Sequence, residues 1–183
     1  MKVLGVDLGL RTCGYVLCNV ENLNVTLIKE GEIIPIVHQP LPQKLSFIFE
    51  ELAKEITAYK PVAIIVEKLY SHYRHPTTLG ILAQVRGIIG LLAYQKKIGF
   101  FEYSPTRARK SFLGRGNVDS NQVRKMAENI TGRKIKSNHT ADAFSLVVAF
   151  SHEQKFKKVL HCASAYARCA GHAPRRNTYF LPR

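Results

Sequence analysis

Residues 62–66, with the sequence Val-Ala-Ile-Ile-Val, narrow the possible folds more than any other part of this chain, because they are apolar without polar alternation. A strand that is covered on both faces of a sheet has this pattern, whereas a strand with one wet face alternates. The run follows residues 42–60, where apolar side chains recur at helical spacing, and Pro61 ends that helix. The chain is therefore predicted to be an α/β protein.

Periodicity and turn residues predict the other elements of the fold. Five strands are expected, at residues 3–8, 14–18, 25–36, 62–66 and 100–103. Helices are expected at residues 42–60, 77–96, 120–130 and 138 to about 156. The first two strands form a hairpin, and later strands alternate with helices. This order predicts a mixed five-stranded sheet flanked by helices.

The charge of the chain points to a polyanionic partner. Its 27 Lys and Arg against 13 Asp and Glu give a formal net charge of +14. Such a surface attracts nucleic acid, although an anionic membrane or the ribosome would also suit it. All the Asp and Glu residues lie within residues 1–154, whereas Lys and Arg are the only residues with a formal charge in 155–183. We therefore expect one folded domain over 1–154 and a poorly ordered basic tail over 155–183.

The sequence favours a cytoplasmic protein that does not associate with a membrane. No run is expected to reach transmembrane length, and Asp7 comes too early for a secretory apolar region. Four cysteines, two in the body and two in the tail, suggest no disulfide framework, so reduced thiols are expected. The spacing of the tail Cys and His residues fits none of the usual zinc modules.

Two acidic residues stand at the ends of apolar strands. Asp7 and Glu67 each lie at or near the carboxyl end of a predicted strand, where burial of a lone carboxylate is costly without a cation or hydrogen bonds. Either acid alone suits an ordinary paired carboxylate. Because ligands of open α/β sheets gather beyond the carboxyl ends of strands, the two acids together suggest one metal site.

His139 and Asp142 add further donors at the start of the last predicted helix. Their spacing of three places both on one helical face, the one that carries Leu146 and Phe150. Helix capping does not explain them, because Asn138 or Ser137 supplies a better cap. Carboxylates with one imidazole suit Mg²⁺ or Mn²⁺, and two such ions about 4 Å apart could clamp a phosphodiester. The implied reaction is hydrolysis of nucleic acid.

The predicted helix over residues 77–96 has an unusual face of small residues. They are Gly80, Ala83, Gly87 and Gly90. Each helical glycine costs about 1 kcal/mol against alanine, so close approach of another backbone is indicated. The face could be a subunit interface, or the helix could be buried on two sides within its own domain.

Several short motifs together resemble the RuvC family of Holliday-junction resolvases, which has the ribonuclease H-like fold. They lie at residues 5–15, 66–67, 84–87, 103–105, 114–116, 122–123 and 139–143. Each motif is weak alone, but their order and spacing both fit over about residues 1–152.

The resemblance implies an activity and a catalytic set. The family cuts four-way DNA junctions by paired symmetric nicks, through metal-ion-assisted hydrolysis. Asp7, Glu67, His139 and Asp142 would be the catalytic residues and would bind the ions. The resemblance also implies a homodimer, since a four-way junction has two-fold symmetry, with the small-residue face as the candidate seam. Cooperation with a branch-migration complex is left open.

The same resemblance suggests residues for contact with DNA. Tyr70 matches the position of an aromatic wedge at the junction, although a packed core tyrosine would explain it equally well. The basic candidates are Arg74, Arg86, Arg107, Arg109, Lys110 and Arg115. Arg109 stands where a DNA-contacting lysine is common. Solvated surface charge is the alternative for all of these basic residues.

Two departures from the family pattern keep other functions open. The segment between Glu67 and Arg86 is about one residue longer than usual, and Ser120 stands where relatives often have a second lysine. A related nuclease that acts on structured RNA or on other branched DNA is one alternative. A catalytically idle junction-binding protein is the other, and the complete four-residue set argues against it.

Overall fold

The computed structural model describes residues 1–69 and 76–169, those after Gln154 as helix backbone only. One five-stranded sheet with strand order β3-β2-β1-β4-β5 forms its centre. The strands are β1 (Lys2–Asp7), β2 (Cys13–Glu21), β3 (Asn24–Ile33), β4 (Ala63–Glu67) and β5 (Gly99–Tyr103). The first three strands are antiparallel neighbours, whereas β4 and β5 run parallel to β1. The predicted mixed five-stranded sheet is confirmed.

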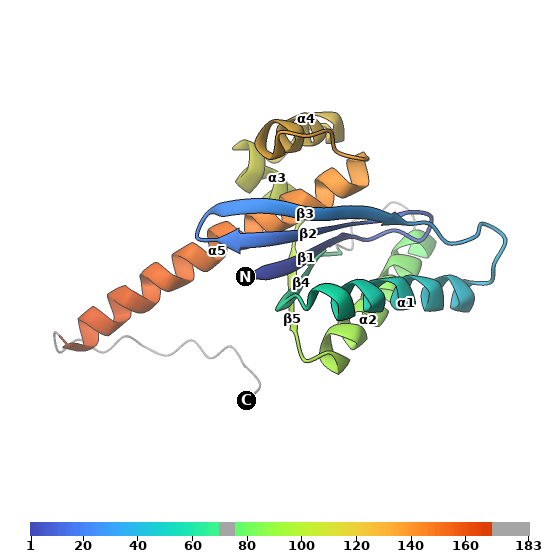
Figure 1. The fold of residues 1–183 in the computed structure, drawn as a ribbon, viewed down its shortest axis with the longest axis horizontal. Helices are drawn as coiled ribbons and strands as arrows, with labels where there is room; N and C mark the ends of the chain where they lie inside the picture. The colour runs from blue at the N-terminus through green and yellow to red at the C-terminus, as the bar shows by residue number, and fades with distance from the viewer. Residues whose placement is uncertain (70–75, 170–183) are drawn as a thin grey trace.

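Helices cover both faces of this sheet (Figure 1). One face packs against α1 (Leu41–Tyr59) and α2 (Pro76–Gln95), through strand residues such as Leu4 and Ile64. The other face packs against α3 (Pro105–Leu113), α4 (Ser120–Thr131) and α5 (Asn138–Cys169), through residues such as Val3 and Ile65. Neighbouring positions of the central strands thus enter opposite cores, which explains why residues 63–66 show no polar alternation, whereas Val62 precedes β4 and is exposed.

The start of α5 lies very close to the sheet. A Cβ added at Gly5 would stand 2.6 Å from the carbonyl oxygen of Ala143, and one added at Gly14 would stand 2.6 Å from the carbonyl carbon of His139. Both strand positions therefore need glycine, because any side chain would collide with helix backbone. This close approach brings the first turns of α5 to the carboxyl ends of β1 and β4.

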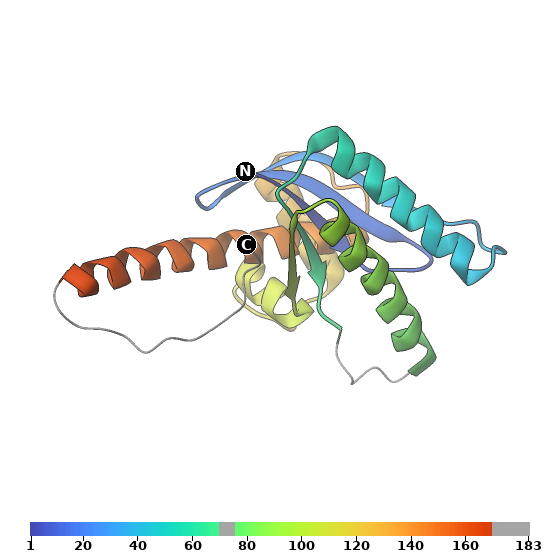
Figure 2. The same cartoon turned by 90° about the horizontal axis from the view of Figure 1, so that it is seen from below.

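Strand β2 continues to Glu21 rather than ending at 18, and three further elements differ from the sequence-based expectations. Strand β3 ends at Ile33 rather than 36, just before Pro35, which has no N–H for a sheet ladder. Helix α3 was not predicted, although Ser104 caps it by accepting from the Arg107 N–H at 3.1 Å and Gly114 ends it. Helix α5 does not end near 156 but continues to Cys169, projecting away from the sheet (Figure 2). The domain boundary at residue 154 stays a prediction.

Helix α2 is more apolar than an ordinary surface helix. Within the described ranges it is the one helix that is long and apolar enough, by length and composition, to cross a membrane. The expectation that no run reaches this length was therefore wrong, although a single such helix is weak evidence for a membrane protein. Val85, Ile89 and Leu92 of α2 are fully buried against the sheet, and Leu91 and Tyr94 are exposed.

Candidate active site

Three carboxylates from distant parts of the sequence line one hollow. Parallel pairing aligns Val6 of β1 with Val66 of β4, so the next residues, Asp7 and Glu67, end neighbouring strands at the same edge. Asp142 reaches this edge from the first turns of α5. The hollow measures about 220 Å³, and its lining residues are Asp7, Glu67, Pro105, Ala108, Arg109, Asp142, Ser145 and Leu146. The structure therefore brings three of the four predicted site residues into one hollow.

The hollow brings three carboxyl groups together in a partly buried space. Burial raises the pKa of Glu67 well above its usual range, and the neighbouring Asp7 and Asp142 carboxylates raise it further. Burial also raises the pKa of Asp142, although the positive charge of Arg109 opposes that shift. Clustered carboxylates in a partly buried space are stabilised by a cation, so the chemistry of these donors fits a hard divalent ion.

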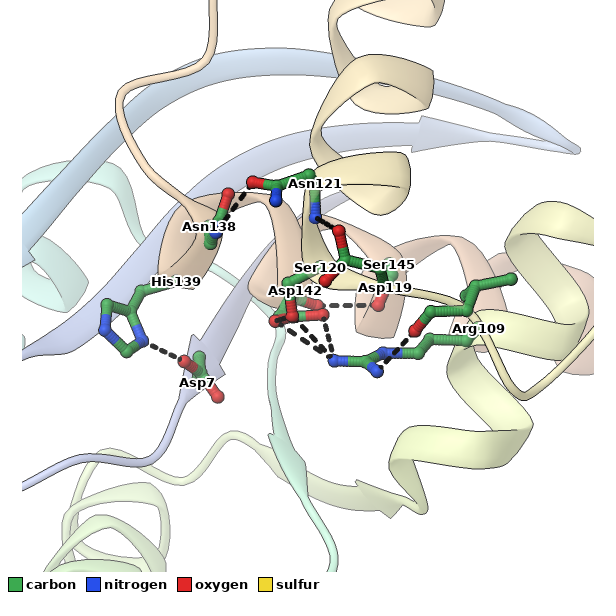
Figure 3. A network of polar contacts seen from close by, with 10 residues as sticks. Asp7, Arg109, Asp119, Ser120, Asn121, Asn138, His139, Asp142 and Ser145 are labelled. Atoms are coloured by element: carbon green, nitrogen blue, oxygen red, sulfur yellow. Dashed lines mark hydrogen bonds and ion pairs between the residues drawn. The ribbon is translucent and has the colours of Figure 1, made fainter.

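His139 approaches Asp7 from outside the hollow. Its Nδ1 lies 2.8 Å from Asp7 Oδ2, and half of its side chain is exposed. The hydrogen bond to Asp7 raises the pKa of His139. Figure 3 shows His139 on one side of Asp7, with Asp142 and Arg109 on the other. His139 thus contacts the cluster of acids through Asp7 and does not itself line the hollow.

The start of α5 is tied down by polar contacts. Ser137 accepts a hydrogen bond from the Thr140 N–H at 3.3 Å, which confirms Ser137 as a capping residue. The side chain of Asn138 donates to that of Asn121 at the start of α4 at 3.3 Å (Figure 3). These contacts leave His139 and Asp142 available for other partners.

Arg109 pairs with Asp142 inside the site. It donates to the two Asp142 oxygens at 3.2 and 3.5 Å, and to Ser120 Oγ at 3.0 Å. Its other terminal nitrogen donates to the backbone oxygen of Val118 at 2.8 Å. Ser120 in turn donates to Asp142 at 3.3 Å (Figure 3). Ser120, in the place where the resemblance has a lysine, therefore holds Arg109 and Asp142 together.

As the side chains stand, they do not form a ready metal cage. Among the residues the structure describes, no group of three or more His, Cys, Asp and Glu is close enough to hold a metal ion. The physical reason is visible in the partners: Asp7 faces His139, and Asp142 faces Arg109. Both aspartates already have a positively charged or polar neighbour, so ion binding would require some of these side chains to turn.

The other predicted DNA-contacting residues fall into three groups. Arg86 pairs with Glu102, its Nη2 lying 2.6 Å from Oε2, and Arg107 pairs with Glu153 at 3.3 Å. Lys110 and Arg115 are exposed and have no ion pair with a described residue. Tyr70 and Arg74 lie outside the described residues.

The small-residue face of α2 is open in this chain. Gly80, Ala83 and Gly87 are exposed, and in the part of the chain that the structure describes nothing lies within 4 Å of a Cβ added at either glycine. Gly90 is partly buried, and its added Cβ would meet Phe100 at 3.9 Å. Burial of this face within its own domain, one of the two alternatives, is therefore wrong for the first three positions. The face as a subunit interface stays a prediction.

The sequence did not indicate the wall of the site that α3 provides. Pro105, Ala108 and Arg109 line the hollow from this helix, together with Ser145 from α5. The signals were a Ser-Pro pair at residues 104–105 and a glycine at 114, which together are typical of a short capped helix. They would have placed Arg109 on a helix facing Asp142.

A mixed sheet with acids at the carboxyl ends of its two central parallel strands, and a third acid from a crossing helix, defines a ribonuclease H-like domain. Within that class the chain belongs to the RuvC family: residues 3–152 match the family model described as Crossover junction endodeoxyribonuclease RuvC. The chain is similar to the protein of that description from Brachyspira hyodysenteriae, with 31% identity over 155 residues, 85% of this chain and 96% of the relative.

Solved structures agree on the fold. A RuvC structure from Thermus thermophilus matches with a TM-score of 0.72 and 20% identity, over 81% of this chain and 92% of that one. A second structure, of Thermus thermophilus RuvC in complex with a Holliday junction substrate, matches with a TM-score of 0.72 and 19% identity over the same shares. The ribonuclease H-like fold predicted from the sequence is confirmed.

Proposed function

We propose that this protein is a crossover junction endodeoxyribonuclease that resolves four-way DNA junctions by paired, symmetric nicks. The observation that carries the proposal is the meeting of Asp7, Glu67 and Asp142 in one hollow of a chain that matches the RuvC family over residues 3–152. The relative from Brachyspira hyodysenteriae has this activity in its name, and a related structure holds a Holliday junction substrate. The bacterial relatives of this chain support the cytoplasm as the place where it would cut junctions.

The proposed reaction is metal-ion-assisted hydrolysis of a phosphodiester. Asp7, Glu67 and Asp142 would hold Mg²⁺, with His139 as a fourth donor and with Mn²⁺ as a substitute. When bound, two such ions supply an activated water and stabilise the leaving oxygen. Because the donors are mainly carboxylates, hard divalent ions should bind in preference to softer metals.

The other side chains of the site have roles that follow from their contacts. His139 orients Asp7 through the 2.8 Å hydrogen bond. Arg109, anchored by Val118 and Ser120, keeps a positive charge at the wall of the hollow, where a phosphate would need it. Ser120 holds Arg109 in line, so one arginine and one serine serve where the resemblance has lysines.

We also propose that the active form is a homodimer joined through the exposed face of α2. Gly80, Ala83 and Gly87 stand opposite the buried Val85 and Ile89 on this helix, so a second copy could approach without touching the core contacts. The exposed Leu91 and Tyr94 lie on the same side and would add apolar area. Two sites related by a two-fold axis suit a substrate with two-fold symmetry.

The nuclease proposal is tested with a synthetic four-way junction in the presence of Mg²⁺ or Mn²⁺. Wild-type protein should cut two opposing strands at symmetric positions, and Asp7→Asn should bind the junction without cutting it. Duplex, flap and structured RNA substrates in competition distinguish the other nuclease activities. Junction binding without nicking by the wild type, in either ion, would identify an idle binding protein and contradict the proposal.

A thermal melt gives a readout that is independent of cutting. Mg²⁺ should raise the melting temperature of the wild type, because an ion that binds only the native state stabilises it. Asp7→Asn should lose most of this rise. An equal rise in both proteins would mean that the ion binds elsewhere.

The dimer is tested by Gly87→Leu in analytical ultracentrifugation. A leucine on this face would separate two closely packed backbones, so the variant should sediment as a monomer. Asn129→Leu, on the exposed part of α4, adds a similar apolar side chain elsewhere and should sediment as a dimer. An unchanged dimer for Gly87→Leu would remove α2 as the seam.

A further inference from the structure

A second hollow lies beside the candidate active site. It measures about 460 Å³, and its lining residues are Gly9, Leu10, Arg11, Thr12, Thr78, Ile81, Leu82 and His139. One wall is the turn between β1 and β2, and the other is the first half of α2. His139 lines this second hollow, whereas Asp7, its hydrogen-bond partner, lines the first. The Asp7–His139 pair therefore separates two adjoining spaces.

Both walls of the second hollow are fixed by the fold. A Cβ added at Gly9 would stand 2.0 Å from the carbonyl oxygen of Thr12, so the turn closes tightly on itself and requires glycine. On the other wall, the adjacent turns of α2 are anchored by the fully buried Val85 and Ile89. The hollow is thus largely preformed, and its size falls in the range of about 300–1,000 Å³ that is usual for binding sites of small groups.

The lining combines apolar and hydrogen-bonding groups. Leu10, Ile81 and Leu82 contribute aliphatic surface. The side chains of Arg11, Thr12 and Thr78 contribute donors and acceptors, and none of the three has a hydrogen bond or ion pair with any residue in the described ranges. No carboxylate of a described residue lines this space. Its chemistry suits a flat, partly apolar group with polar edges that belongs to an anionic chain, which describes a nucleotide.

Arg11 differs from three of the arginines that the sequence singled out, although Arg115 also has no ion pair with a described residue. Arg86, Arg107 and Arg109 are each paired with a carboxylate of this chain. Arg11 is exposed at the rim of a hollow and has no such partner among the described residues. An arginine without an internal partner can donate two parallel hydrogen bonds to a base edge, which is the commonest way that a protein reads a base.

We infer that the second hollow binds the nucleotide next to the scissile phosphate and sets the sequence preference of the cut. The aliphatic residues would contact the base or sugar, and Arg11 with Thr12 would read the polar edge of the base. Arg11 is then a specificity-determining residue. The inference rests on the proposed function, because the strand enters the second hollow only when its phosphate lies in the first.

The test uses four-way junctions whose crossover can move through a randomised core, with the nicked strands sequenced. Wild-type protein should favour one base at one position next to the cut by about fivefold or more, as expected for one arginine–base contact. Arg11→Gln should lose that preference. Arg124→Gln removes the same charge from α4, where the arginine pairs with Glu128 at 3.4 Å, and should keep the preference.

The outcomes separate the two proposals. No nicking by the wild type would overturn the proposed nuclease and the inference with it. Nicking without any base preference, or with a preference that Arg11→Gln keeps, would overturn the inference alone. Loss of the preference in Arg124→Gln as well would also overturn it. A melting curve checks that Arg11→Gln is folded, and if it is not, Thr12→Val decides by the same criterion.

Discussion

The strand-borne and the helix-borne residues of the site are positioned in different ways. Asp7 and Glu67 end two neighbouring parallel strands, so backbone hydrogen bonds fix where they stand. His139 and Asp142 depend on how closely α5 approaches the sheet, and on partners such as Arg109 that orient them. Strand register thus fixes the positions of Asp7 and Glu67, whereas side-chain contacts fix the orientations of His139 and Asp142. Substitution of a strand-borne acid should change the charge of the site, and changes around the helix-borne residues should change how their side chains are aligned.

The largest effect is expected for Glu67→Gln. Nicking should fall about a hundredfold or more, the scale of losing one strong electrostatic contact in a transition state. Junction affinity, measured by fluorescence anisotropy, should change little. Asp119→Asn, which keeps the cap of α4 and lies outside the hollow, is the matched control and should retain full activity. If Glu67→Gln nicked the junction at the wild-type rate, Glu67 would not be needed for cleavage, although strand register places it beside Asp7.

The same variant has a signature in stability. The folded-state pKa of Glu67 is raised, chiefly by burial, so the folded protein binds this proton more tightly than the unfolded chain does. Its ionisation therefore lowers stability as the pH rises from the unfolded pKa, 4.5, through the raised folded value. Without divalent ions, Glu67→Gln should lose less stability than the wild type between acid and neutral pH. Urea unfolding measures this difference, and Glu50→Gln, an exposed acid, should follow the wild type.

A smaller effect is expected when α5 is pushed from the sheet. In Gly14→Ala the new methyl group would collide with the backbone of His139, so overpacking should cost about 1–3 kcal/mol of unfolding free energy. Nicking should fall as well, because His139 and Asp142 move with the helix. The methyl group of Gly80→Ala meets no described residue within 4 Å, so this variant should instead be neutral or slightly stabilising. Equal stability of both variants would show that the close approach is not needed.

The smallest effect is expected for Ser120→Ala. The Ser120 hydroxyl joins Arg109 and Asp142, and its loss should raise the activation free energy of nicking by about 1 kcal/mol, which is about a fivefold decrease in the rate. Ser46→Ala, on the exposed side of α1, is the control. An unchanged rate would show that the backbone oxygen of Val118 is enough to hold Arg109.

Much of the fold was predictable because it follows from local pattern. The apolar run at residues 62–66, the helix that Pro61 ends, and the hairpin around Gly9 were all found from periodicity and turn residues. Helix α3 was not predicted because its nine residues are too few to show a clear apolar period. The end of α5 was not predicted because the basic composition suggested a disordered tail, although basic residues can also continue a helix.

The acidic residues of the candidate site could be predicted from the sequence, but the contacts between its side chains could not. Asp7 and Glu67 were predicted from the strands they end, and Asp142 from its helical face. The pairing of Arg109 with Asp142 depends on how α3 and α5 meet, which no local pattern contains. Arg11 was not singled out either, because a turn arginine looks like ordinary surface charge until a hollow is found beside it.

The central place of β1 has a consequence for how the protein loses activity. This strand is hydrogen-bonded on both sides, to β2 and to β4, so its amides should exchange with solvent only when the whole sheet opens. Asp7 thus ends a strand that is paired on both sides. Fraying of the termini or of outer helices should leave it in place, and enzyme that survives partial opening should regain its activity once the outer elements close again.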